Sequence, residues 1–206
     1  MIFELLEKMR FGKHEQDDPY HSKNTVIFNN ADQLYRFAQE NNLFLAFTGA
    51  LGMSIWKGRI HRCLNDVDII VRQEDRATWQ QKLHSLGFTL QRNKNCIQKQ
   101  PAFQKAAKMA HFDGKMDWMM DTKIQAFNSK ISGVQLKVDM YFTTDVTSAN
   151  FVTKAVNEHV FTVTDFEWSV HKKQAILLQE TAGAAPRSTL LARTKHIMDL
   201  IHYNVK

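Results

Sequence analysis

Hydrophobic residues recur along the chain with two different periods, and these periods predict its helices and strands. A spacing near 3.6 residues is typical of a helix with one buried face, whereas short apolar or alternating runs are typical of strands. We expect helices over 2–10, from Ala31 onward behind a cap at Asn29 or Asn30, over 49–58 after a turn, and over 74–86, 166–181 and 188–203. We expect a loop over 12–24 and strands over 43–48, 66–71, 88–91, 123–127 and 134–142, the last two forming a hairpin.

The order of these elements indicates the fold class. Helices and strands are mixed up to residue 142, and the last predicted elements, beyond Asp165, are helices. This order predicts an α/β (α+β) protein with a mixed sheet flanked by helices and a helical C-terminal part. We expect a core over 1–160 and a helical subdomain over 161–206. Residues 92–122 fit neither period, and we interpret them as a basic insertion in the core.

Composition narrows the class of protein. The chain has 206 residues, 44% of them hydrophobic and 23% charged, which is the balance of a folded globular protein. No apolar run approaches the ~20 residues that cross a bilayer, and the first residues include Glu where a signal peptide has Lys or Arg. We therefore expect a cytoplasmic protein without a membrane partner, with Cys63 and Cys96 as reduced thiols.

The positive charge is concentrated in one segment. The formal net charge is +6, and residues 92–130 hold eight Lys or Arg against three Asp, which leaves +5 there. Such a segment is either a solvated surface or a surface that tracks phosphates, and the second interpretation admits RNA as a partner.

Three of the eight glycines and three aspartates carry the candidate chemistry. Gly49, Gly52 and Gly58 follow the strand predicted over 43–48, and a glycine turn before a helix exposes backbone N–H groups that bind phosphate. Asp66 and Asp68 lie two residues apart in a strand and therefore share a face. Close carboxylates need a cation or a proton between them, and Mg²⁺ prefers such ligands together with substrate phosphates. Asp139 could supply a third carboxylate if its strand is adjacent.

The segment 47–69 combines these features in one order: the Gly-Ala-Leu-Gly turn, then Gly58-Arg59-x-x-Arg62, then Asp66-x-Asp68. It resembles the signature of the nucleotidyltransferase superfamily, which has the polymerase β-like fold. Its spacing is especially similar to that of the lincosamide and aminoglycoside nucleotidyltransferases. Residues near the C-terminus also resemble helical motifs of this group and of the AbiEii-type toxin nucleotidyltransferases, namely Glu167, Lys173, Arg193, Lys195 and Asp199.

The resemblance implies a fold, an activity and a set of site residues. The fold would be the nucleotidyltransferase-like mixed sheet, and the activity Mg²⁺-dependent transfer of a nucleoside monophosphate from an NTP, with ATP expected, to a hydroxyl acceptor such as an antibiotic. Asp66, Asp68 and Asp139 would be the catalytic and metal-binding residues, with Asp139 either completing the metal site or accepting the proton of the hydroxyl. The implied nucleotide-binding residues are Thr48, Gly49, Ala50, Arg59, Arg62, Lys173 and Asp199.

Two other functions fit the same residues. The basic segment 92–130 favours a toxin-type nucleotidyltransferase that acts on tRNA. Ala50 stands where the family usually has a second Gly or Ser, which favours a non-catalytic domain that only binds nucleotides. Nucleotide binding without transfer would distinguish the second alternative from both enzymes.

Overall fold

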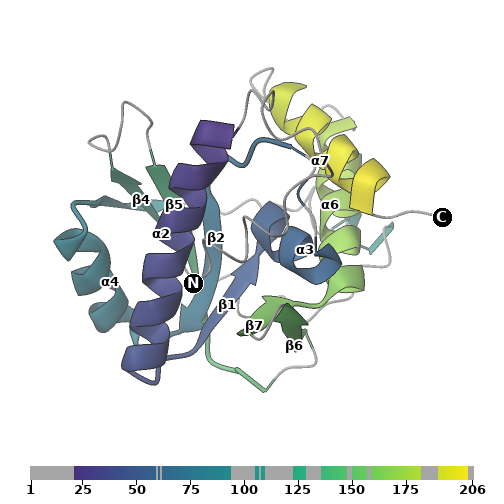
Figure 1. The fold of residues 1–206 in the computed structure, drawn as a ribbon. Coiled ribbons are helices and arrows are strands. Elements are labelled where there is room, and N and C mark those ends of the chain that lie inside the picture. The colour runs from purple at the N-terminus through teal and green to yellow at the C-terminus, as the bar shows by residue number, and fades with distance from the viewer. Residues whose placement is uncertain are drawn as a thin grey trace.

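The centre of the molecule is a seven-stranded mixed sheet (Figure 1). The computed structural model describes residues 21–58, 60, 62–93, 105–106, 108–109, 123–128, 136–147, 150–156, 159–181 and 190–203. The strand order is β3-β4-β5-β2-β1-β7-β6. The strands are β1 (Leu45–Thr48), β2 (Val67–Arg72), β3 (Thr89–Asn93), β4 (Lys123–Asn128), β5 (Leu136–Thr143), β6 (Phe151–Val156) and β7 (His159–Thr164).

Five described helices cover the two faces of this sheet (Figure 1). The helices are α2 (His21–Glu40), α3 (Gly49–Lys57), α4 (Arg76–Ser85), α6 (Phe166–Thr181) and α7 (Leu190–Tyr203). Leu34 of α2 and Trp79 of α4 are completely buried in the main core with Ile69 and Met140 of the sheet. On the opposite face, α6 packs its Trp168 and Ala175 near Ile70 and Tyr141. Asp68 and Asp139 alternate with the main-core residues of their strands, so their side chains lie on the face that α6 covers.

Strand pairing confirms the predicted hairpin and shows that the two aspartate strands are adjacent. β4 and β5 pair antiparallel, with Gln125 opposite Asp139. β5 then pairs parallel with β2, which pairs antiparallel with β1. Leu136, Val138, Met140 and Phe142 all lie in the main core, as the alternating pattern predicts. The mixed α/β sheet flanked by helices is therefore confirmed.

The helix predicted to begin at Ala31 is wrong in its start, because α2 already includes residue 21. Asn29 and Asn30 both lie inside the helix, where Asn29 is exposed and Asn30 is buried in the same stripe as Ile27 and Leu34. One of the polar residues that suggested a loop, Asn24, instead makes tertiary hydrogen bonds. It donates its side-chain N–H to the Arg62 carbonyl and accepts a hydrogen bond from the Leu64 backbone N–H.

The sequence patterns also missed the antiparallel pair of β6 and β7. β7 joins the sheet through a parallel contact of Val163 with Phe47 of β1. The domain boundary expected at residue 160 falls inside β7, and that division stays a prediction. The helix expected over 2–10 lies outside the described residues. Among the helices that the structure describes, none combines the length and the apolar character needed to cross a bilayer.

Candidate active site

Three neighbouring strands bring Thr48, Asp68 and Asp139 into one row across the sheet. Thr48 pairs in register with Asp68, and Asp68 pairs with Asp139 on the other side. Thr48 ends β1, whereas Asp68 is the second residue of β2. The parallel pairing of β2 and β5 therefore places two carboxylates side by side that no local sequence pattern connects.

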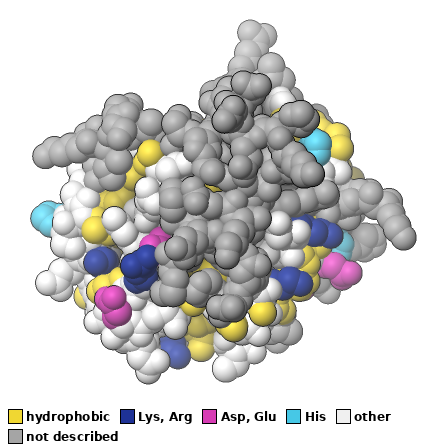
Figure 2. Space-filling view, in the orientation of Figure 1, with side chains coloured by type: hydrophobic (Ala, Val, Ile, Leu, Met, Phe, Trp, Pro, Cys, Tyr) yellow, Lys and Arg dark blue, Asp and Glu magenta, His cyan; other side chains and the backbone are white. Residues whose placement is uncertain are grey.

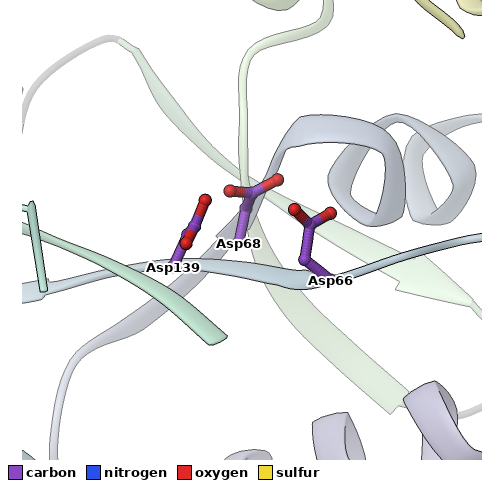
Figure 3. Close-up of side chains that lie close together, drawn as sticks. All are labelled: Asp66, Asp68 and Asp139. Atoms are coloured by element: carbon purple, nitrogen blue, oxygen red, sulfur yellow. The ribbon is translucent and has the colours of Figure 1, made fainter. Parts of the chain in front are cut away.

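Asp66 completes a group of three carboxylates. It precedes β2 by one residue, and its side chain lies on the same side of the sheet as those of Asp68 and Asp139 (Figure 3). One carboxylate oxygen from each residue lies within 4.8 Å of the other two. Asp139 is almost fully buried, whereas Asp66 and Asp68 are half-buried and open toward the pocket described below. We call Asp66, Asp68 and Asp139 the acidic triad.

Two other side chains of β5 contact the triad. The Lys137 ammonium donates hydrogen bonds to Asp139 Oδ2 at 2.8 Å and to Asp66 Oδ2 at 3.2 Å. Tyr141 places its hydroxyl 3.4 Å from Asp68 Oδ1. Burial acts to lower the pKa of Lys137, but the negative charges of Asp139 and Asp66 outweigh it and hold that pKa above its usual value. Lys137 is therefore a cation at neutral pH.

Gly49 makes room for the Asp68 carboxylate. Gly49 begins α3 with φ of +64°, in the left-handed region that favours glycine. A Cβ atom at this position would overlap Asp68 Oδ2. The glycine of the turn is therefore required by the neighbouring carboxylate as well as by the backbone, a reason that sequence inspection did not supply.

The packing of α3 against β1 explains why residue 52 is a glycine. A Cβ atom there would lie 2.7 Å from the Phe47 carbonyl oxygen, so the missing side chain lets α3 approach β1. Gly58, in contrast, ends α3 as a left-handed cap with open space around its Cα. The three clustered glycines thus have three different structural roles, of which only that of Gly49 touches the triad.

A further buried carboxylate, that of Asp199, holds two basic side chains. Asp199 of α7 is completely buried and accepts hydrogen bonds from Arg62 Nε at 2.6 Å and from Lys173 Nζ at 2.6 Å. A second bond joins the Arg62 guanidinium to Asp199 Oδ2 at 2.9 Å, so the pair is bidentate. Asp199 therefore fixes Arg62 and Lys173 together although they come from a loop and from α6.

The acidic triad and the two cations held by Asp199 line one pocket of about 410 Å³. Besides the triad and Lys137, its lining includes the start of α3 and basic residues of α6 and α7. A pocket lined by both carboxylates and cations suits an anionic ligand that also carries a metal ion. Its lining residues are Thr48, Gly49, Ala50, Arg62, Asn65, Asp66, Asp68, Lys137, Asp139, Tyr141, Ser169, Lys172, Lys173, Ile176, Lys195 and His196.

His196 contributes a neutral imidazole to the basic side of the pocket. Its Nδ1 atom is buried and has no hydrogen-bond partner among the described residues. Burial first, and then the positive charge of Lys173, lower the pKa of His196 to about 3, although Asp199 opposes the shift. His196 is therefore uncharged at neutral pH.

Most of the implied nucleotide-binding residues lie at this pocket. Thr48, Gly49, Ala50, Arg62 and Lys173 line it, whereas Asp199 lies behind Arg62 and Lys173 and is not among the lining residues. Arg59 lies outside the described residues. The pocket also contains residues that sequence inspection missed, chiefly Lys137 and Tyr141. Each lies two residues from Asp139 along β5 and therefore on the same face of the sheet, and this spacing is the signal that could have found them.

The basic segment 92–130 falls mostly outside the described residues. On the face of the molecule in Figure 2, the Lys and Arg side chains of the described residues lie in separate groups.

The donor chemistry of the triad fits a hard divalent cation. All three side chains offer carboxylate oxygens, which Mg²⁺ prefers, and the triad already holds a positive group in the Lys137 ammonium. The pocket leaves space beside the triad for the phosphates that usually share such an ion.

Comparison with known proteins identifies the fold. No protein-family model matches the sequence, and no curated protein matches it. The structure is similar to that of ANT(2")-Ia in complex with adenylyl-2"-tobramycin, with 14% sequence identity and a TM-score of 0.53 over 85% of this chain and 86% of that chain. At this identity the similarity establishes the nucleotidyltransferase fold.

Two further solved structures resemble the chain at lower TM-scores. The lincomycin-bound lincosamide antibiotic adenylyltransferase LnuA has 11% identity and a TM-score of 0.47 over 85% of this chain and 97% of that one. An antigenic nucleotidyltransferase-like protein from Paracoccidioides brasiliensis has 16% identity and a TM-score of 0.46 over 87% of this chain and 73% of that one.

Proposed function

We propose that this protein is a Mg²⁺-dependent nucleotidyltransferase that moves a nucleoside monophosphate from an NTP to a hydroxyl group of a small molecule. ATP is the expected donor, and an antibiotic is the nearest analogy for the acceptor, since ANT(2")-Ia has been solved with an adenylylated tobramycin. The observation that carries the proposal is the acidic triad, which shares one pocket of the nucleotidyltransferase fold with Gly49 and the Arg62 and Lys173 cations.

In this proposal each side of the pocket has its own task. Asp66 and Asp68 would hold Mg²⁺, which neutralises charge on the triphosphate and on the reacting phosphorus when it is bound. The backbone at Gly49 and Ala50, with the Thr48 hydroxyl, would bind phosphate oxygens at the start of α3. Arg62 and Lys173 would attract the β- and γ-phosphates, and Asp199 would position both cations from behind.

The transfer exchanges one bond at the α-phosphorus of the nucleotide for another. The acceptor oxygen forms a bond to the α-phosphorus while the bond between that phosphorus and the bridging oxygen breaks, and pyrophosphate leaves with the electron pair. The hydroxyl proton goes to a carboxylate of the triad or to water. Asp139 is the buried member of the triad, and its two candidate roles are metal ligand and proton acceptor.

Labelling of a cell extract tests the proposal. The purified protein is incubated with each α-labelled NTP, Mg²⁺ and an extract that is afterwards separated into small molecules, RNA and protein. We expect label in the small-molecule fraction, dependent on Mg²⁺, abolished by Asp68→Asn and kept by Glu74→Gln, which changes an exposed carboxylate in the same way. Label in the RNA fraction would instead support the tRNA alternative. Nucleotide binding without label in any fraction would leave a non-catalytic binding domain.

A further inference from the structure

Lys137 occupies an unusual place for a basic residue, between two carboxylates that are expected to bind a metal ion. Its ammonium lies 2.8 Å from Asp139 and 3.2 Å from Asp66, and about a quarter of its side chain is exposed. It stands two residues before Asp139 on β5 and therefore shares the face of the triad. The position follows from the sheet register and not from a flexible loop.

This ammonium and a divalent cation compete for the same carboxylates. Asp139 Oδ2 and Asp66 Oδ2 are the two atoms that Lys137 contacts, and both residues belong to the triad. A cation bound by Asp66 and Asp139 would be repelled by a positive charge at hydrogen-bond distance from both, so the ammonium must move away from the carboxylates as the ion enters.

The displaced ammonium needs a new anionic partner. The remaining basic lining residues cannot supply one, whereas the phosphates of a nucleotide can, because a triphosphate has several oxygens in reach of more than one cation. A metal ion that binds alone breaks the hydrogen bonds between Lys137 and the carboxylates and supplies no other anion for the ammonium. A metal ion that arrives with a nucleotide brings the replacement with it.

We propose that Lys137 is a resident counter-ion of the triad that makes tight metal binding depend on the nucleotide. The inference rests on the proposed function, since it assigns Lys137 a positioning role toward the metal and phosphate of that reaction. Without a nucleotide the ammonium holds Asp66 and Asp139 together and disfavours the free ion. With a nucleotide it transfers its hydrogen bonds from the carboxylates to the phosphates.

Metal titration without turnover tests this role. Free Mn²⁺ is measured by its paramagnetic resonance signal while it is added to the protein alone and to the protein saturated with a non-hydrolysable α,β-methylene ATP. In the parent we expect the nucleotide to tighten Mn²⁺ binding strongly. In Lys137→Met, which keeps the length of the side chain without its charge, we expect Mn²⁺ alone to bind at least about tenfold tighter than in the parent, so that the coupling to nucleotide shrinks.

Three further measurements make the result decisive. Lys137→Arg keeps the charge and should keep weak binding of Mn²⁺ alone, and Lys137→Gln, which also removes the charge, replaces Lys137→Met if that variant fails to fold. Lys108→Met removes an exposed lysine that does not line the pocket and should behave as the parent does. Thermal melting with and without Mn²⁺ should show a larger metal-induced stabilisation in Lys137→Met than in the parent.

The possible outcomes separate this inference from the proposed function. Equal affinity for Mn²⁺ alone in the parent and in Lys137→Met would overturn the role of Lys137, while nucleotide transfer in the labelling experiment would keep the proposed function intact. Absence of Mn²⁺ binding in the parent both with and without nucleotide would overturn the inference, and absence of transfer as well would overturn the proposed function.

Discussion

Asp68 and Asp139 are register partners on the parallel strands β2 and β5. Their pairing ties the candidate metal site to the centre of the sheet, with β1 on one side and β4 on the other. Each of the two strands is fixed by neighbours on both sides, so the relative position of the two carboxylates is determined by backbone hydrogen bonds and not by side-chain packing alone.

From this pairing we expect Asp139 to be a metal ligand. Asp139→Asn should weaken Mn²⁺ binding in the presence of α,β-methylene ATP by at least about tenfold, as Asp68→Asn should, because each removes a negative oxygen from the same ion. Titration with Mn²⁺ measures both. Asp145→Asn, at an exposed residue beyond β5, is the charge-matched control. Normal Mn²⁺ binding with loss of transfer in Asp139→Asn would instead make Asp139 the proton acceptor.

Gly49 and Gly58 offer a comparison between two glycines with the same backbone conformation. Their φ angles are +64° and +65°, so an alanine at either should cost roughly 1–2 kcal/mol of unfolding free energy. Only at Gly49 would the new methyl group push the Asp68 carboxylate aside. We therefore expect Gly49→Ala to lose nucleotide transfer, while Gly58→Ala, which has the same backbone strain without the overlap, keeps it. Urea unfolding measures the stability of the two variants, and the labelling assay measures their nucleotide transfer. Transfer by Gly49→Ala would contradict the argument.

Asp199 should be among the most sensitive positions for stability. Asp199→Asn leaves Arg62 and Lys173 buried with their shared carboxylate gone, and removal of one partner of a buried ion pair costs about 3–5 kcal/mol. Asp32→Asn is the control, since its partner Arg36 is half-exposed and can be hydrated, and the expected cost is below about 1 kcal/mol. Urea unfolding measures both. Equal costs would show that Asp199 does not hold the two cations.

His196 predicts a dependence of stability on pH. Its pKa is lowered to about 3 in the folded protein, against 6.5 for the unperturbed group. Below pH 6.5 the unfolded chain binds a proton that the folded one does not, so this stabilisation is complete above pH 6.5 and is lost as the pH falls toward 3. Between pH 7 and 5 the loss is up to about 2 kcal/mol.

The variant His196→Gln should lose less unfolding free energy than the parent over that pH range. His202→Gln, at an exposed histidine of the same helix α7, should follow the parent. Urea unfolding at pH 7, 6 and 5 measures the three proteins. Identical pH profiles for the parent and His196→Gln would contradict the assignment.

The sequence predicted the elements that build the triad but not the whole pocket. Period-two alternation over 134–142 correctly separated the core residues of β5 from Asp139, because each strand side chain is assigned to a face by position alone. Lys137 obeys the same alternation, but its contact with Asp66 depends on the β2–β5 pairing, which no local pattern specifies. Asn24 was assigned to a loop because it ends a polar stretch, and the hydrogen bonds that it makes inside the fold reach a segment far along the chain, which no local pattern shows.

The glycines show the same difference between local and tertiary information. Their clustering indicated a turn into a helix, and α3 confirms it. The reason for Gly49 lies across the sheet in Asp68, and the reason for Gly52 lies in the carbonyl of Phe47. Sequence inspection could find that glycine was needed at these positions but not which neighbour required it.

The two halves of the pocket are attached to parts of the molecule that differ in how they can move. The carboxylates of Asp68 and Asp139 belong to strands with partners on both sides, and such interior strands open only when the whole domain unfolds. Lys173 and Asp199 belong to α6 and α7, which can shift as a pair without breaking a strand pairing. A change of shape that admits different acceptors would therefore be a movement of α6 and α7 relative to the fixed strands β2 and β5. We expect backbone hydrogen exchange to be slow in β2 and β5 and faster in α7.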